Sequence, residues 1–200
     1  MSFRIIGTGS AVPSKIVTND DLSGMMETND EWIRTRVGVA ERRIATTEST
    51  ADLAYEAAAK ALEMSGVSAD AIDLIIVATI TSDRICPTTA GMVQARLGAS
   101  CPAFDISSAC SGFLFAMETA AGFFARGTVK HALVIGAERI SKIIDWKDRS
   151  TAVIFGDGAG AAVLEAGNSY LCSEICTMGG DDVIKIPAFG GTSPFTEIEK

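Results

Sequence analysis

An unbroken apolar run, Ile72 to Thr79 (IDLIIVAT), constrains the fold of this chain more than any other feature. It is rich in β-branched residues and flanked by residues that break regular structure, which predicts a strand buried on both faces. Strands of this kind belong to sheets that carry helices on both faces. The run therefore favours an α/β fold.

Strands and helices alternate along the rest of the chain. The sequence predicts further strands at 3–9, 103–106 and 131–138, and helices at 29–36, 50–65, 87–97 and 110–125. Because alternating strands and helices with two-sided strands build parallel sheets layered with helices, we expect a mostly parallel sheet. Near the end, residues 151–166 (TAVIFGDGAGAAVLEA) hold two apolar runs separated by glycines and an aspartate, which predicts a hairpin.

Local signals support two of these helices. Thr18, followed by two acidic residues, is typical of the cap of a short helix. In the helix predicted at 50–65, Thr50 can cap the start and Gly66 can end it. Its expected buried face consists of Leu53, Ala57, Ala61 and Met64.

Composition and charge exclude several function classes. The net charge of the 200 residues is -8 and no cluster of Lys and Arg follows a stripe of aromatic residues, so we expect neither a nucleic-acid nor a membrane partner. The most lipid-like stretch, residues 111–124, is interrupted by Glu118 and is shorter than the roughly 20 residues that span a bilayer. The N-terminal sequence lacks a signal-peptide pattern, which predicts a cytoplasmic location.

The five cysteines do not form a disulfide framework, because their number is odd and their spacing irregular. We expect thiols. Cys172 and Cys176 lie four residues apart, which on a strand points both the same way. No nearby histidine or further cysteine completes a zinc shell, so we predict no metal site.

Cys110 lies where a predicted strand gives way to a long apolar helix, in AFDISSACSGFLFAMETAAGFFARG. Small residues and Gly112 around it permit a tight turn. Free amides and the helix dipole stabilise a thiolate there, and the same amides can polarise a thioester carbonyl under attack. The spacing alone fits equally well a small buried cysteine at the start of a core helix.

Four blocks of sequence carry a resemblance that extends along nearly the whole chain. They are IIGTGSAVP, TNDEWIRTRVGVAERR, CPAFDISSACSGF and DRSTAVIFGDGAGAAVL. In this order they resemble the β-ketoacyl-acyl carrier protein synthase III family of thiolase-like condensing enzymes. The resemblance implies a thiolase-like fold of two similar halves, each with a mixed, mostly parallel five-stranded sheet. Residues 1–170 would form the first half and 171–200 the truncated start of the second.

The same resemblance implies a two-stage reaction. Cys110 would accept an acyl group from acyl-CoA, and malonyl-acyl carrier protein would then condense with it and lose CO2. In the family this needs a histidine and an asparagine from the second half, and the only histidine here, His131, matches no catalytic position. A homodimer is implied, with the strand at 131–138 as its shared edge. Two alternatives remain open: a priming ketosynthase of secondary metabolism, and a non-catalytic scaffold half.

Trp32 and Arg36 lie four residues apart on a predicted helix, so they share a face that can stack on a planar base. A tryptophan packed on its neighbour's alkyl stem is the alternative. The resemblance places the adenine of CoA at Trp32 and Arg149, with Arg36 and Thr28 reaching the same nucleotide. It implies CoA thioesters as substrates and no cofactor or metal.

Two other features bear on ligand binding. The pair Gly7 and Gly9 invites a dinucleotide-binding interpretation, but Val12 stands where a third glycine belongs and Pro13 blocks the helix start. The resemblance places Cys86 where the family often has a bulky apolar residue bounding the partner's acyl pocket. A smaller side chain there favours a longer or branched acyl group, whereas an inert loop cysteine is the alternative.

Overall fold

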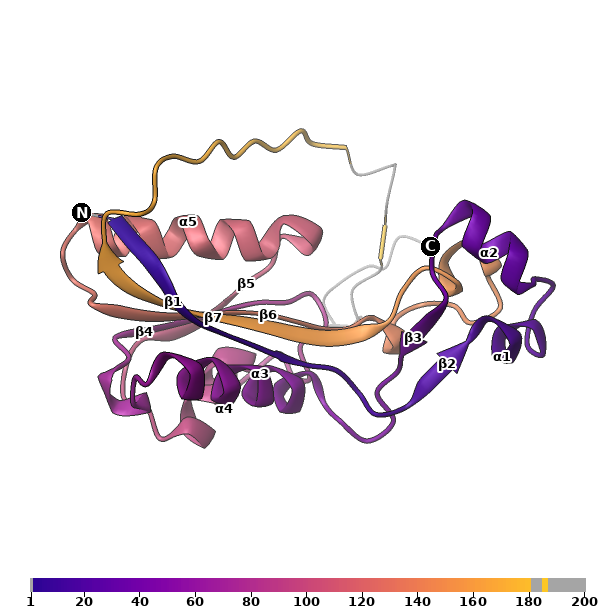
Figure 1. Cartoon of the computed structure of the whole chain (residues 1–200), viewed down its shortest axis with the longest axis horizontal. Coiled ribbons are helices and arrows are strands. Elements are labelled where there is room, and N and C mark those ends of the chain that lie inside the picture. Colours follow the sequence, from indigo (N-terminus) through magenta and orange to yellow (C-terminus); the bar gives the residue numbers. More distant parts are fainter. Residues whose placement is uncertain (1, 181–184, 187–200) are drawn as a thin grey trace, which may run out of the picture.

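A five-stranded sheet forms the centre of the computed structural model, which describes residues 2–180 and 185–186 (Figure 1). Its strand order is β1-β7-β6-β4-β5. The strands are β1 (Ser2–Ala11), β4 (Leu74–Ala78), β5 (Ala103–Ile106), β6 (His131–Arg139) and β7 (Asp157–Gly167). Strand β7 runs antiparallel to both of its neighbours, and β4 pairs in parallel with β5 and β6. Four strands therefore point in one direction, which confirms the mixed, mostly parallel sheet.

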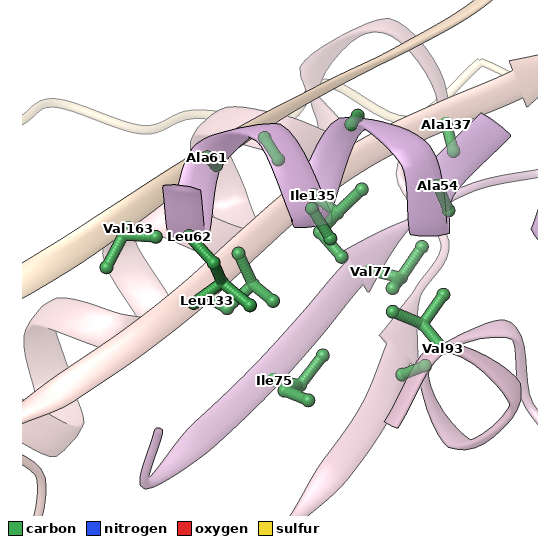
Figure 2. Packing of buried hydrophobic residues seen from close by; sticks show 14 of the residues in the cluster. Ala54, Ala61, Leu62, Ile75, Val77, Val93, Leu133, Ile135, Ala137 and Val163 are labelled. Carbon is green, nitrogen blue, oxygen red and sulfur yellow. The ribbon is translucent and has the colours of Figure 1, made fainter. Parts of the chain in front are cut away.

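Helices cover both faces of this sheet. Helices α3 (Thr50–Ser65) and α4 (Thr89–Leu97) pack on one face, and α5 (Gly112–Ala125) packs on the other (Figure 1). Figure 2 shows how Ala54, Ala61 and Leu62 of α3 meet aliphatic side chains of the central strands. Strand β4 is buried at every position, as its apolar sequence predicts.

Helix α3 has the predicted bounds but a different cap. Ser49, not Thr50, caps it and forms a capping box with Asp52. Thr50 is buried and donates its hydroxyl to the carbonyl of Thr81, 2.6 Å away. Met64 is 68% exposed, so its predicted place on the core face is wrong.

A small lobe extends from the carboxyl end of β1. It contains the two-stranded pair β2 (Ile16–Thr18) and β3 (Glu41–Arg43) and the helices α1 (Asn19–Ser23) and α2 (Asp30–Arg36). Thr18 caps α1, as predicted. Buried Arg42 joins the lobe to the segment after α6 (Arg149–Ala152), because its guanidinium donates to Asn19 at 2.8 Å and to the Val153 carbonyl at 3.1 Å.

The predicted hairpin at 151–166 is wrong. Thr151 lies in α6, and β7 is a single strand that pairs along its length with β1 and β6. Asp157 begins strand β7 and does not form a hairpin turn. Its carboxylate accepts hydrogen bonds from the backbone amides of Ala45 and Ser141 at 2.7 and 2.9 Å. A Cβ at Gly156 would lie 3.1 Å from the carbonyl oxygen of Arg43, so this glycine serves a close approach.

Strand β6 lies inside the sheet, between β4 and β7. It therefore presents no free edge, and the expectation that 131–138 joins two copies is wrong. The edges of the sheet are β1 and β5. Strand β6 is interior because its residues pair with β4 on one side and with β7 on the other.

Residues 168–180 follow β7 without a helix or strand, and Cys172 and Cys176 are exposed there rather than sharing a strand. The second half was expected to begin at residue 171, and most of the segment 181–200 lies outside the described residues. Among the residues that the structure describes, none of the helices is long and apolar enough to cross a membrane.

Candidate active site

Cys110 lies in a turn of 3-10 helix, Ala109–Ser111, between the end of β5 and the start of α5. The predicted helix start at Cys110 is thus two residues early, because α5 begins at Gly112. Ala109 has a φ of 43°, a left-handed conformation that residues other than glycine rarely adopt. Cys110 is exposed, so the alternative of a buried core cysteine is wrong for the described chain.

Two glycines let this turn approach the sheet closely. A Cβ at Gly112 would lie 3.1 Å from the Cβ of Ala78, at the end of β4. A Cβ at Gly136 of β6 would lie 3.3 Å from the ring of Phe113. Larger residues at either position would push the first turn of α5, and Cys110 with it, away from the strand ends.

A pocket of about 290 Å³ opens beside the sulfur. Cys110 and Glu138 are the two titratable residues on its wall, which is otherwise apolar. The remaining lining residues are small or aromatic: Ala78, Ala109, Phe113, Gly136, Ala137, Gly158, Ala159 and Gly160. Such a wall suits a short apolar group held next to a nucleophile.

Glu138, at the end of β6, holds the turn that follows β4. Its carboxylate accepts from the amide of Ile80 at 2.8 Å and from the hydroxyls of Thr81 and Thr79. Burial raises the pKa of Glu138 above its ordinary value, against the lowering effect of these hydrogen bonds. Sequence reasoning did not single out this residue, although an acid directly after the apolar run HALVIGA was a usable signal.

The other cysteines lie in different surroundings. Cys101 is half-buried, and burial together with the charge of Asp73 raises the pKa of its thiol. Cys86 is exposed in the loop after β4. Among the described residues no group of histidine, cysteine and acidic side chains has the arrangement of a metal site.

A cluster of one tryptophan and two arginines lies on the lobe. The guanidinium carbons of Arg36 and Arg149 lie 4.9 and 5.3 Å from the centre of the Trp32 ring. Arg149 also donates to the carbonyl of Glu27 at 2.8 Å, which fixes it beside the ring. The buried hydroxyl oxygen of Thr28 has no hydrogen-bond partner within the described chain. Residues from distant parts of the sequence are thus brought together.

The lobe and Cys110 lie at the same end of the sheet. Strands β1 and β5 run in the same direction; β1 leads into the lobe and β5 leads into the Cys110 turn (Figure 1). His131 begins β6 and therefore lies at the opposite end, where its ring nitrogen is 3.6 Å from Glu165. This placement agrees with the expectation that His131 has no catalytic role.

An exposed cysteine at the turn into a helix, on a mixed five-stranded sheet layered by helices, is the arrangement of thiolase-fold condensing enzymes. Comparison with known proteins narrows this class. A family profile described as 3-oxoacyl-[acyl-carrier-protein (ACP)] synthase III matches residues 104–179. Over most of its length the chain is similar to the N-terminal part of proteins of this family, also called β-ketoacyl-acyl carrier protein synthase III.

Individual proteins of this family are similar to the chain in sequence and in structure. The β-ketoacyl-[acyl-carrier-protein] synthase III of Xanthomonas campestris is 55% identical over 165 residues, which are 82% of this chain and 51% of the relative. The crystal structure of the synthase III from Aquifex aeolicus superposes with a TM-score of 0.82 at 49% identity, covering 84% of this chain and 55% of that one. The priming β-ketosynthase of the R1128 polyketide pathway superposes with a TM-score of 0.79 at 38% identity, covering 83% and 50%. The chain therefore spans about half the length of these relatives.

Proposed function

We propose that this chain supplies the nucleophile half of a condensing acyltransferase that initiates fatty-acid synthesis. The observation that carries the proposal is the exposed sulfur of Cys110 at the turn into α5, beside a small apolar pocket. The names of the relatives support the activity. We propose a cytoplasmic location for this reaction.

In the first stage the sulfur of Cys110 attacks the thioester carbonyl of acyl-CoA. A new S–C bond forms, the bond from the carbonyl carbon to the CoA sulfur breaks, and CoA leaves with the electron pair and takes a proton. The strained turn at Ala109 presents the sulfur to the pocket, where Phe113 and the glycines of β6 and β7 leave room for the acyl group. No metal or other cofactor takes part in this step.

In the second stage malonyl-acyl carrier protein loses CO2. The electron pair of the broken C–C bond forms a new bond to the acyl carbon, and the sulfur of Cys110 leaves as thiolate. We propose that a histidine and an asparagine of the second half stabilise the enolate that develops. The single histidine of the chain, His131, lies at the other end of the sheet from Cys110. Residues 1–170 would thus form the first half and 171–200 the start of the second.

The Trp32 cluster is proposed as the site for the adenine of CoA. An adenine ring can stack on Trp32, with Arg149 or Arg36 on its other face. The unpartnered hydroxyl of Thr28 offers a hydrogen bond to the same nucleotide. Both guanidinium groups lie near the tryptophan ring, so an adenine that stacks between the ring and one arginine requires that guanidinium group to move outward.

Trp32→Ala should weaken CoA binding about 10- to 100-fold, because it removes the stacking surface and the partner of both arginines. Isothermal titration of CoA checks this. Trp146→Phe is the matched control. Trp146 packs against the same hydrophobic cluster as Trp32, but its ring nitrogen donates a hydrogen bond to the carbonyl of Ser141. Equal affinity of the wild type and Trp32→Ala would contradict the assignment.

Acyl transfer tests the function itself. Protein that carries both halves of the fold is incubated with a short radiolabelled acyl-CoA, and the labelled peptide is mapped. We expect label on the peptide that contains Cys110 and on no other cysteine peptide. Label on Cys86, or no label on any cysteine, would contradict the proposal.

One alternative has specific support. The likeness to the R1128 priming β-ketosynthase favours a priming ketosynthase of secondary metabolism as second candidate. The exposed Cys110 argues against a scaffold half, because a non-catalytic relative has no need of this sulfur. Comparing the acyl-CoA chain lengths that label Cys110 separates the two enzymes, and Cys86 is the residue we expect to widen the range.

We also propose a homodimer joined through β5 rather than β6. Strand β5 is a sheet edge with unpaired backbone groups, which proteins seldom leave open. Sedimentation velocity should show dimers at micromolar concentration. A well-folded chain that stays monomeric there would contradict this assembly.

A further inference from the structure

We propose that Glu138 is a specificity-determining residue whose negative charge keeps acyl groups with a second carboxylate away from Cys110. The inference rests on the proposed function, in which Cys110 is acylated, and it defines the substrate class as neutral acyl groups. Glu138 and Cys110 lie on the wall of the same pocket, and the rest of that wall is apolar.

The hydrogen bonds of Glu138 fit an ionised carboxylate. The amide of Ile80 can only donate. The hydroxyl of Thr81 already accepts from the amide of Arg139 at 2.8 Å, and the hydroxyl of Thr79 accepts from the amide of Thr81 at 3.1 Å. Each hydroxyl is therefore free to direct its hydrogen to the carboxylate. Three donors converge on this side chain, as an anion requires.

Nearby positive charges are engaged elsewhere. Within residues 2–180 no lysine or arginine forms an ion pair with Glu138. The ammonium of Lys142 donates to the carbonyls of Thr81 and Ser82 at 2.6 and 3.0 Å and lies 3.5 Å from Asp83. The guanidinium of Arg139 points to the carbonyl of Ala45. The charge of Glu138 is therefore not cancelled by a direct partner.

An anionic group in this pocket meets the like charge of Glu138, and like charges repel. A neutral acyl group of the same size meets no such repulsion. Malonyl and succinyl groups would thus be rejected at Cys110, while acetyl and butyryl groups enter. A malonyl unit then serves only as the attacking partner.

Alkylation tests this charge effect without any enzymatic turnover. Iodoacetamide and iodoacetate are nearly equal in size and differ in charge, and both alkylate a thiolate with loss of iodide. Rates at Cys110 are measured by peptide mapping at one pH, with exposed Cys176 as reference within the same sample. The ratio of the two rates cancels changes in thiolate fraction and in access, which affect both reagents.

Glu138→Gln should raise the ratio of iodoacetate to iodoacetamide reactivity at Cys110 about three- to tenfold and leave the ratio at Cys176 unchanged. Glu138→Asp keeps the charge and should keep the wild-type ratio. Equal acceleration by both reagents in Glu138→Gln, or no change in the ratio, would overturn the proposal. So would a Glu138→Asp variant that behaves as Glu138→Gln does, because shape rather than charge would then decide.

A second arm compares succinyl-CoA with butyryl-CoA, whose acyl chains both contain four carbons. Glu138→Gln should gain succinylation of Cys110 by at least about threefold relative to butyrylation. If the alkylation ratio shifts but neither thioester labels Cys110 in any variant, the proposed function fails while the charge discrimination stands. If butyryl-CoA labels Cys110 and neither ratio shifts, the role of Glu138 fails while the function stands.

Discussion

Cys110→Ser should lower acyl transfer from acyl-CoA by at least about a thousandfold in protein that carries both halves of the fold. An alkoxide is much harder to form than a thiolate at the same position. Mass spectrometry of the intact protein after incubation with acyl-CoA checks this. Condensation with malonyl-acyl carrier protein should be absent.

Malonyl decarboxylation is the internal control for this variant. The groups proposed to stabilise the enolate lie outside the Cys110 turn, so decarboxylation should persist in Cys110→Ser. Cys176→Ser is the matched second control, because it changes an exposed cysteine outside the pocket and should keep acyl transfer at Cys110. Full condensing activity in Cys110→Ser would refute the mechanism.

The strands of the sheet could be predicted because burial on both faces leaves a clear pattern in sequence. β4, β5 and β6 agree with their predicted ranges within two residues. The hairpin prediction failed at Gly158 and Gly160, because glycine marks close packing or a strand of small residues as readily as a turn. Local sequence does not separate these cases, since β1, one of the two partner strands of β7, lies more than a hundred residues away.

Part of the candidate site could also be predicted from the sequence. Cys110 and the Trp32 cluster came from local motifs and the family resemblance, and the structure brings Trp32, Arg36 and Arg149 together. Glu138 escaped notice because its place beside Cys110 depends on the parallel pairing of β4 with both β5 and β6. Neighbours in a sheet of this kind are set by topology, which residue spacing does not encode.

The pair Gly7 and Gly9 illustrates what the structure adds. Sequence reasoning excluded a dinucleotide site and left the glycines without a role. In the structure they lie beneath α3, where a Cβ at Gly9 would lie 2.2 Å from the carbonyl oxygen of Ala57 and 2.5 Å from the amide nitrogen of Ala61. The missing side chains let the helix backbone approach β1 directly, and the helix then buries its alanines against the sheet.

Gly9→Ala should therefore lower the free energy of unfolding by about 3 kcal/mol or more. The added methyl group meets backbone atoms, which cannot rotate away as a flexible side chain does, so α3 must shift from β1 and lose its packing. Chemical denaturation followed by circular dichroism measures the change, and a variant that is unfolded without denaturant agrees with it.

Gly160→Ala is the matched control. Gly160 lies on β7, opposite Ser10 and next to the partner of Gly9, and a Cβ there meets no atom within 4 Å. The same chemical change in the same pair of strands should alter stability by less than about 0.5 kcal/mol. Similar losses in both variants would show that glycine is needed for the strand conformation itself, and the close approach of α3 to β1 would no longer explain Gly9.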